Sequence, residues 1–195
     1  MNASGSASGG DPLAMMLSTS WGITAVGNAE AVGINPSALA ATCVLESGCG
    51  GNLGSGAAQG VFQMFPAAYE DGLQTALAAN SQLGTQVVPG NAGMNDPTTE
   101  AIAASGYLMQ AATTLQGAGV SNPTVLDARG FYNFGPAYGI AVATAPDSAP
   151  MSQVLAGVPN SVFTGNNIQP EETVGQWRAA VSAVVGNAAG QSVLL

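Results

Sequence analysis

Four times in this chain an asparagine or aspartate stands directly before a proline, at residues 11–12, 35–36, 96–97 and 122–123. Proline is favoured at the first position of a helix, and Asn or Asp before it caps the N–H groups that have no partner within the helix. Apolar residues follow at helical spacing, and no segment shows the strong alternation of a strand. We therefore expect a mainly α-helical protein.

Five helices follow from these starts and from the apolar spacing. The first runs from about Pro12 to Ala31, and the second begins at Pro36 and has Glu46 on its last turn, before the glycines at 48, 50 and 51. A third begins at Pro97, and a fourth contains Tyr132 and breaks at Gly135–Pro136. The last lies within residues 171–186, where four apolar residues share one face: Val174, Trp177, Val181 and Val184.

The ionisable residues exclude several kinds of chemistry. The chain has no histidine and no lysine, two arginines, and a formal net charge of −9. A Ser/His/Asp triad, a Schiff base and a Walker-type phosphate loop are therefore excluded, and two cysteines alone cannot hold zinc. A nucleic-acid surface needs many cations, and residues 12–26 are too polar and too short for a membrane helix. We expect no cofactor, no metal, no nucleic-acid partner and no membrane insertion, which leaves carboxylate chemistry or none.

Glu46 is the first candidate for such chemistry. A carboxylate on the last turn of a helix faces the negative end of the helix dipole, which raises its pKa, and burial raises the pKa further. A carboxyl group that keeps its proton near neutral pH can act as a general acid. The alternative from position alone is a solvated charge at a helix end.

The two cysteines flank this glutamate. Cys43 precedes Glu46 by nearly one turn and Cys49 lies just after the expected helix end, so a disulfide between them could hold the turn in place. Two free buried thiols are the alternative. An even number of cysteines is typical of an oxidising compartment without proving one.

Three short segments together resemble the soluble lytic transglycosylase family, whose fold is that of goose-type lysozyme. They are Glu46–Ser47, the run Gly60-Val61-Phe62-Gln63 with a following proline, and Tyr132-Asn133-Phe134-Gly135. The resemblance covers residues 33–140. Departures from the family pattern include Val61 and Phe62 in place of Leu-Met, Phe131 in place of Ala, and Glu100 where Asn is usual, a position whose role stays open.

The resemblance implies a lysozyme-like helical domain with a glycan-binding cleft that cleaves the β-1,4 bond between N-acetylmuramic acid and N-acetylglucosamine. In that family one glutamate acts first as acid and then as base, and a 1,6-anhydro ring closes on the muramoyl product. Glu46 would be this catalytic residue, within an apolar wall from Phe62, Phe134 or Tyr132. Ser47 could bind sugar or only orient Glu46, and Gly60 and Gly135 would let the backbone approach the glycan. The substrate-binding set would be Ser47, Gly60, Gln63, Tyr132 and Asn133.

Length and composition predict one domain at residues 12–160, after a flexible leader at 1–11 and before a C-terminal segment, 161–195, with a docking helix. The resemblance implies peptidoglycan as partner and a periplasmic, extracellular or cell-wall-associated location. A hydrolytic muramidase on the same scaffold is one alternative. Another is a glycan-binding structural component of a secretion, conjugation or phage assembly, with cleavage secondary or absent, because the chain has no cationic surface and residues after 140 match the family poorly.

Overall fold

A computed structural model describes residues 10–50, 56–169 and 171–195. The predicted leader falls almost wholly on residues 1–9, which lie outside the described residues, as does Gly51. The described residues form nine α-helices and three short 3-10 helices, with four isolated β-bridges and no sheet. The mainly α-helical class is confirmed. The elements are α1 (Pro12–Leu17), α2 (Gly22–Val32), α3 (Pro36–Ser47), α4 (Pro66–Ala79), η1 (Ser81–Gln86), η2 (Gly90–Asn95), α5 (Pro97–Gly117), α6 (Val125–Thr144), α7 (Met151–Val154), α8 (Asn160–Gly165), α9 (Val174–Val185) and η3 (Gly186–Gly190).

Helices α3 and α5 begin at the predicted prolines. The side chain of Asn35 accepts a hydrogen bond from Ser37 N (2.9 Å), and that of Asp96 accepts one from Thr99 N (2.8 Å). Each cap satisfies an N–H group that the helix itself leaves without a partner. The Asn-Pro pair at 122–123 does not start a helix directly: Thr124 is the cap of α6, and Asp127 completes a capping box with it.

The single helix predicted from Pro12 to Ala31 is wrong, because the chain turns between α1 and α2. The hydroxyl groups of Ser18 and Thr19 donate to the carbonyl oxygens of Met15 and Met16, at 2.6 and 2.8 Å, and thereby end α1. The turn is tight. A side chain on Gly22 would place its Cβ 1.9 Å from the Met16 carbonyl oxygen.

The predicted break at Gly135–Pro136 is a kink within α6. Gly135 has φ 75° and ψ 178°, outside the helical region, and the helix continues after Pro136 to Thr144. Proline cannot take its place in the helical hydrogen-bond ladder, and glycine adopts a positive φ without steric cost. The axis of α6 therefore changes direction at Gly135.

Helices α4 and α5 cross with almost no side chain between them. A Cβ on Gly106 would lie 1.9 Å from the Gly72 carbonyl oxygen, and one on Gly72 would lie 2.2 Å from the carbonyl oxygen of Ala103. Small residues thus let two backbones meet, which is how a chain rich in glycine and alanine builds a close-packed interior.

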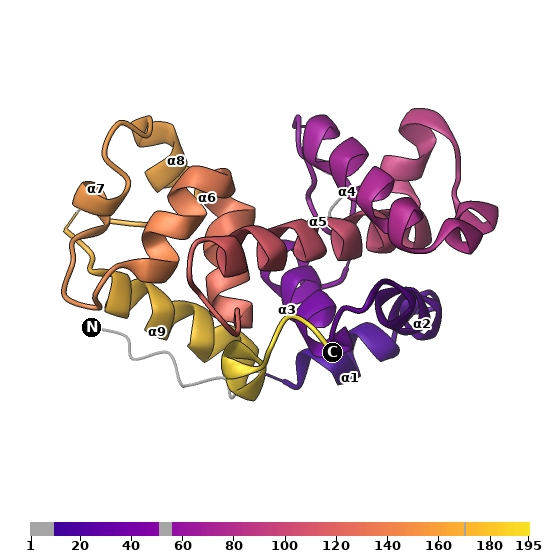
Figure 1. The fold of residues 1–195 in the computed structure, drawn as a ribbon, viewed down its shortest axis with the longest axis horizontal. Helices are drawn as coiled ribbons and strands as arrows, with labels where there is room; N and C mark the ends of the chain where they lie inside the picture. Colours follow the sequence, from indigo (N-terminus) through magenta and orange to yellow (C-terminus); the bar gives the residue numbers. More distant parts are fainter. Residues whose placement is uncertain (1–9, 51–55, 170) are drawn as a thin grey trace.

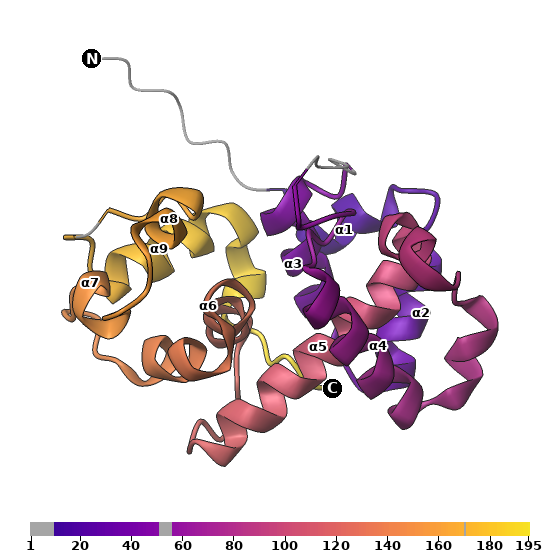
Figure 2. The same ribbon diagram turned by 90° about the horizontal axis from the view of Figure 1, so that it is seen from above.

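The helices form two groups joined through α5 and α3 (Figures 1 and 2). One group holds α1, α2, α4, η1 and η2, and the other holds α6 to α9. The last residues tie the groups together, since Val193 N donates to the Pro123 carbonyl (2.9 Å) while Val193 O accepts from Asn35 N (2.9 Å). Among the described residues, no helix has the length and apolar character needed to cross a membrane.

The C-terminal helix α9 packs into the same core as the rest of the protein. Val174, Trp177 and Val181 are buried as predicted, but Val184 is 43% exposed and Val185 is fully buried in its place. The eleven-residue step from Val174 to Val185 completes three helical turns, so Val185 continues the buried face, and Val184 lies 100° away from it.

Candidate active site

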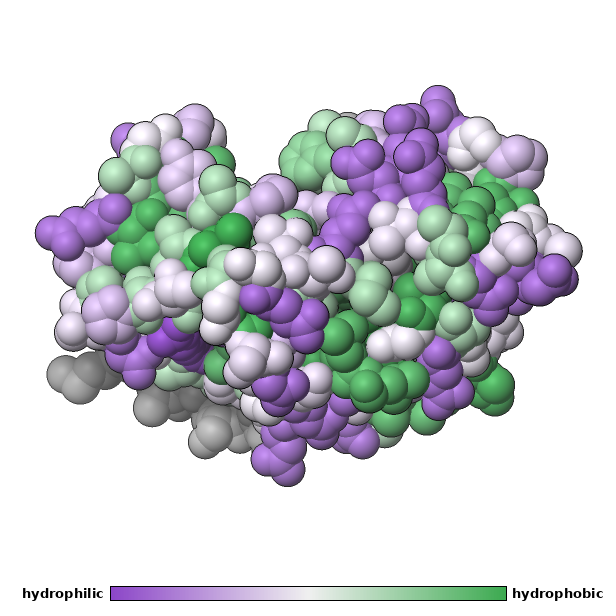
Figure 3. All heavy atoms as spheres, viewed as in Figure 1, coloured by the Kyte–Doolittle hydropathy of each residue, from purple (hydrophilic) through white to green (hydrophobic). Residues whose placement is uncertain are grey.

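A cleft of about 720 Å³ separates the two groups of helices on one face of the molecule. In the space-filling view it is the hollow between the lobes formed by α8 and by α4 (Figure 3). Its size is within the range of ligand sites. Sixteen of the described residues line it: Leu45, Glu46, Ala58, Gln63, Met64, Phe65, Ala68, Tyr107, Arg129, Tyr132, Asn133, Ser161, Val162, Gly165, Asn166 and Asn167.

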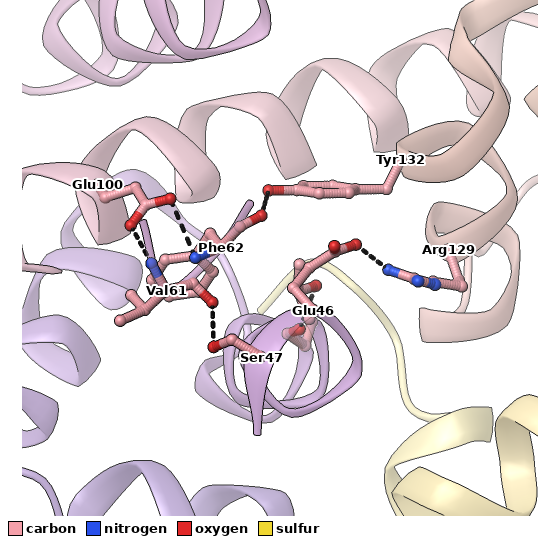
Figure 4. A network of polar contacts seen from close by, with 9 residues as sticks. Glu46, Ser47, Val61, Phe62, Glu100, Arg129 and Tyr132 are labelled. Carbon is pink, nitrogen blue, oxygen red and sulfur yellow. Dashed lines mark hydrogen bonds and ion pairs between the residues drawn. The ribbon is translucent and has the colours of Figure 1, made fainter. Parts of the chain in front are cut away.

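Glu46 lies on the last turn of α3 and lines this cleft. Its side chain is 15% exposed and forms an ion pair with Arg129 from α6 (Figure 4). Burial raises the pKa of Glu46 above its ordinary value, and the positive charge and hydrogen bond of Arg129 oppose that rise without cancelling it. The carboxyl group is therefore a weaker acid than a solvated glutamate, as a general acid requires.

The disulfide between Cys43 and Cys49 is confirmed, with the two Cα atoms 5.0 Å apart. The end of α3 carries a second fixture. Gly48, at φ 66°, donates to the Val44 carbonyl, which is the αL pattern of a helix end, and Cys49 N donates to the Cys43 carbonyl. The backbone that carries Glu46 is thus fixed by hydrogen bonds and by a covalent bond.

The segment from Gln59 to Met64 forms a tight loop over α3 and α5. Gln59 and Met64 pair with each other through two backbone hydrogen bonds, and Gln63 sits between them at φ 47°, where its Nε2 donates to the Gly60 carbonyl (2.6 Å). The Ser47 hydroxyl donates to the Val61 carbonyl (2.6 Å). Ser47 therefore anchors this loop. Among the described residues its hydroxyl bonds to the loop and not to the Glu46 carboxyl group, so no hydrogen bond supports the predicted role of Ser47 in orienting Glu46.

Glu100, whose role the sequence left open, holds this loop from the buried side. It is 1% exposed, and its two carboxyl oxygens accept from Val61 N (2.6 Å) and Phe62 N (3.0 Å) (Figure 4). Burial raises the pKa of Glu100 to about 8; backbone hydrogen bonds from Phe62, Val61 and Met64 act in the opposite direction, and the charge of Glu46 adds to the rise. Glu100 therefore carries a proton over much of the neutral pH range.

The position of Glu100 explains why residue 60 is a glycine. A Cβ on Gly60 would lie 2.0 Å from Glu100 Oε2, and its φ of 76° also favours glycine. Gly60 is buried and is not among the described residues that line the cleft. Its lack of a side chain makes room for a buried carboxyl group. Gly135, the other glycine predicted to meet glycan, is likewise outside the cleft lining, although the space beside its Cα is open.

Tyr132 and Asn133 line the cleft from α6. The Tyr132 hydroxyl donates to the Phe62 carbonyl (2.8 Å), so α6 also supports the Gln63 loop. Burial raises the pKa of Tyr132 well above its ordinary value, which keeps this hydroxyl a donor. Tyr107 from α5 packs edge-on against Tyr132, with ring centroids 5.4 Å apart.

Of the three aromatic residues predicted to form a wall around Glu46, only Tyr132 is among the described residues lining the cleft. Phe62 is fully buried and packs edge-on against Trp21, and Phe134 packs against Trp177 of α9. Phe65, which was not predicted, lines the cleft in place of Phe62 and Phe134. Its side chain is 59% exposed at the start of α4 and lines the cleft, where a flat ring can receive a sugar face.

The sequence did not predict Arg129, nor the wall of the cleft formed by α8 and the two residues that follow it, here called the α8 wall. Arg129 precedes Tyr132 and Asn133 by three and four residues, so it shares their face of α6, and that spacing is the signal that could have identified it. The α8 wall presents Asn166 and Asn167 to the cleft from a segment outside the family resemblance. Within the described part of the chain, no three Cys, Asp or Glu side chains gather as metal ligands.

A scan against protein-family models and searches of curated proteins and of solved structures find no match to this chain.

Proposed function

We propose that this protein is a peptidoglycan lytic transglycosylase that uses Glu46 as its one catalytic carboxylate. The observation that carries the proposal is that, among the described residues, Glu46 is the only acidic side chain lining the cleft, and burial raises its pKa. A conventional glycosidase needs a second carboxylate across the scissile bond, about 5 to 9.5 Å from the first. Glu100 cannot be that group, since it is buried beneath the loop and both its oxygens accept backbone hydrogen bonds.

One glutamate suffices when the reaction ends in ring closure. Glu46 donates its proton to the glycosidic oxygen as the bond from that oxygen to C1 of N-acetylmuramic acid breaks. The neighbouring acetamido oxygen stabilises the positive charge at C1, as in substrate-assisted glycosidases. Glu46, now a carboxylate, then takes the proton of the C6 hydroxyl while that oxygen bonds to C1. The 1,6-anhydro ring forms and Glu46 regains its proton.

The lining of the cleft is suited to a neutral N-acetylated sugar chain. Gln63 and Asn133 carry amides that can both donate to and accept from acetamido and hydroxyl groups. The exposed ring of Phe65 gives a stacking surface. Asn166 and Asn167 add amides on the opposite wall. We therefore assign sugar binding to these residues, and to Ser47 and Gly60 the indirect role of holding the Gln63 loop in place.

Two other functions use the same cleft. A hydrolytic muramidase would let water, in place of the C6 hydroxyl, attack C1. A glycan-binding component of a cell-wall-penetrating assembly would bind without cleaving. The ion pair between Glu46 and Arg129 favours this candidate, because a carboxylate paired with arginine is protonated less readily, and a general acid must carry a proton. In each case the protein would act at the cell wall, in the periplasm or outside the cell, and the disulfide is in keeping with an oxidising compartment.

The test is digestion of purified sacculi by the wild-type protein and by Glu46→Gln. Glu46→Gln should lose at least ~10²–10⁴-fold in the rate of muropeptide release, the usual contribution of acid and base catalysis. Glu30→Gln, which removes an exposed carboxylate of α2, serves as the matched control and should keep full activity. Glu46→Gln with wild-type activity would refute the proposal.

Mass spectrometry of the released fragments separates the three candidates. Anhydromuramoyl ends, one water lighter than reducing ends, identify the transglycosylase, and reducing ends identify the hydrolase. Sacculi that retain the wild-type protein in a pull-down but are not cut identify the binding component.

A further inference from the structure

Arg129 occupies an unusual position for one of only two cations in the chain. Its side chain is 12% exposed, lines the cleft and pairs with the carboxyl group of Glu46. The other cation, Arg178, lies on α9, pairs with Asp147 (2.5 Å) and donates to the carbonyl oxygens of Val142 and Ala143. One of the two positively charged side chains of the protein therefore contacts the candidate catalytic group.

The other groups near Glu46 do not replace this contact. The Tyr132 hydroxyl of α6 donates to the Phe62 carbonyl, and the neighbouring Ser47 hydroxyl donates to the Val61 carbonyl. Both carboxyl oxygens of Glu100 on α5 accept backbone hydrogen bonds, and Tyr107 of α5 packs against Tyr132. Within the described residues, Arg129 is thus the only side chain that donates a hydrogen bond to the Glu46 carboxyl group.

Burial and the ion pair have opposite effects on Glu46. Burial in a place of low dielectric favours the neutral acid, whereas an opposite charge in contact favours the carboxylate, by about 1 to 3 in pKa. For Glu46 burial is the larger effect, so the pKa is raised, but less than it would be without Arg129. The guanidinium group also fixes the direction of the carboxyl group, because its N–H donors are arranged in a rigid plane.

We propose that Arg129 is the positioning residue of Glu46, and that it holds the carboxyl group in the cleft and sets the upper limit of the pH range in which the protein cleaves glycan. The inference rests on the proposed function. In the first step Glu46 must carry a proton, which Arg129 disfavours, and in the second step it must be a carboxylate, which Arg129 stabilises. The residue therefore favours ring closure at the expense of activity at high pH.

The pH dependence of the cleavage rate tests this directly. Initial rates on dilute sacculi are compared from about pH 4 to pH 9 for the wild type, Arg129→Gln, Arg129→Lys and Arg178→Gln. Arg178→Gln is the matched control, since it too removes one arginine and one ion pair and leaves the cleft lining unchanged. At low substrate concentration the rate follows kcat/KM, whose pH profile reports the pKa values of the free protein.

In Arg129→Gln the pH at which the rate falls to half on the alkaline side should rise by about 1 or more, the smallest effect expected of a contacting charge. Arg129→Lys should keep the limit close to that of the wild type, because the charge is retained, and Arg178→Gln should not move it. An Arg129→Gln profile that coincides with the wild-type profile would overturn the inference.

A second measurement does not depend on activity. The carbon-13 resonance of the Glu46 carboxyl group, assigned by its absence in Glu46→Gln, gives the titration midpoint of Glu46 in the intact protein. The midpoint should rise in Arg129→Gln and stay unchanged in Arg178→Gln. If circular dichroism shows that Arg129→Gln is unfolded, Arg129→Met, with an apolar chain in place of the guanidinium group, is titrated instead.

The two hypotheses fail differently. An active Glu46→Gln refutes the proposed function, whatever Arg129 does. An inactive Glu46→Gln together with an unchanged limit and midpoint in the Arg129 variants refutes the role of Arg129 and leaves the transglycosylase assignment in place.

Discussion

The buried carboxyl group of Glu100 should make the protein lose stability as the pH rises. Its folded-state pKa of about 8 is above the value of 4.5 expected for a solvated glutamate, so between these two pH values the folded protein holds a proton that the unfolded chain has released. The unfolded state then binds fewer protons, and the free energy of unfolding decreases with pH. The contribution of Glu100 is complete below about pH 4.5 and is lost as the pH approaches 8.

The size of the effect follows from the same two values. Each pKa unit corresponds to about 1.4 kcal/mol, so the difference of 3.5 between 4.5 and 8 gives roughly 5 kcal/mol over the whole range. Glu100→Gln removes the titration and keeps the shape, but an amide can present only one acceptor oxygen to the two N–H groups of Val61 and Phe62. The lost acceptor costs about 1–3 kcal/mol at every pH.

Urea unfolding followed by circular dichroism, repeated from about pH 4.5 to pH 8.5, measures both effects. Urea is chosen because it carries no charge and does not screen the groups in question. Glu100→Gln should be the less stable protein at pH 4.5 and the more stable one above about pH 7, so the two stability curves cross. Titrating groups that do not interact with Glu100 contribute equally in both proteins and cancel in the comparison. A constant difference between the two proteins across the pH range would refute the claim that Glu100 is held neutral in the folded state.

Two further changes test the supports of the site. Gly60→Ala would place its Cβ against Glu100 in a positive-φ conformation, and should cost at least about 3 kcal/mol in urea unfolding. Gly119→Ala, at φ 95° with open space around it, isolates the backbone cost of about 1–2 kcal/mol, and equal losses in both variants would contradict the role given to Gly60. Reduction of the disulfide should cost about 2 kcal/mol or less, as its loop is short, and a Cys43→Ser/Cys49→Ser variant should reproduce that loss and become insensitive to reductant. A protein whose stability ignores dithiothreitol would argue against the bridge.

The parts of the fold that could be predicted are those determined by residues close together in the sequence. Asn35–Pro36 and Asp96–Pro97 act on the helix that follows them, and the two cysteines lie six residues apart around one helix end. The turn between α1 and α2 could not be found in this way. Residues 12–31 keep an apolar helical pattern throughout, and the turn depends on Gly22 meeting the backbone of Met16, which is a contact between two elements.

Glu100 was open to prediction only in part. An acid in the first turn of a helix suits the helix dipole and needs no further explanation, so it reads as a solvated charge. However, Glu100 precedes Ala104, Leu108 and Leu115 on one face of α5, and all three are buried. That spacing indicates that Glu100 points inward. Its partners could not be predicted, because they are backbone N–H groups 38 and 39 residues earlier in the chain.

The crossing of α4 and α5 restricts how this sequence can change over evolutionary time. At Gly72 and Gly106 a methyl group would strike the backbone of the opposite helix, and no choice of rotamer removes that clash. Because α4 begins beside Phe65 and α5 carries Tyr107, a wider crossing would also move two walls of the cleft. Distant descendants of this protein could exchange most of their surface and many alanines of the core, but we expect them to retain a pair of very small residues at this crossing.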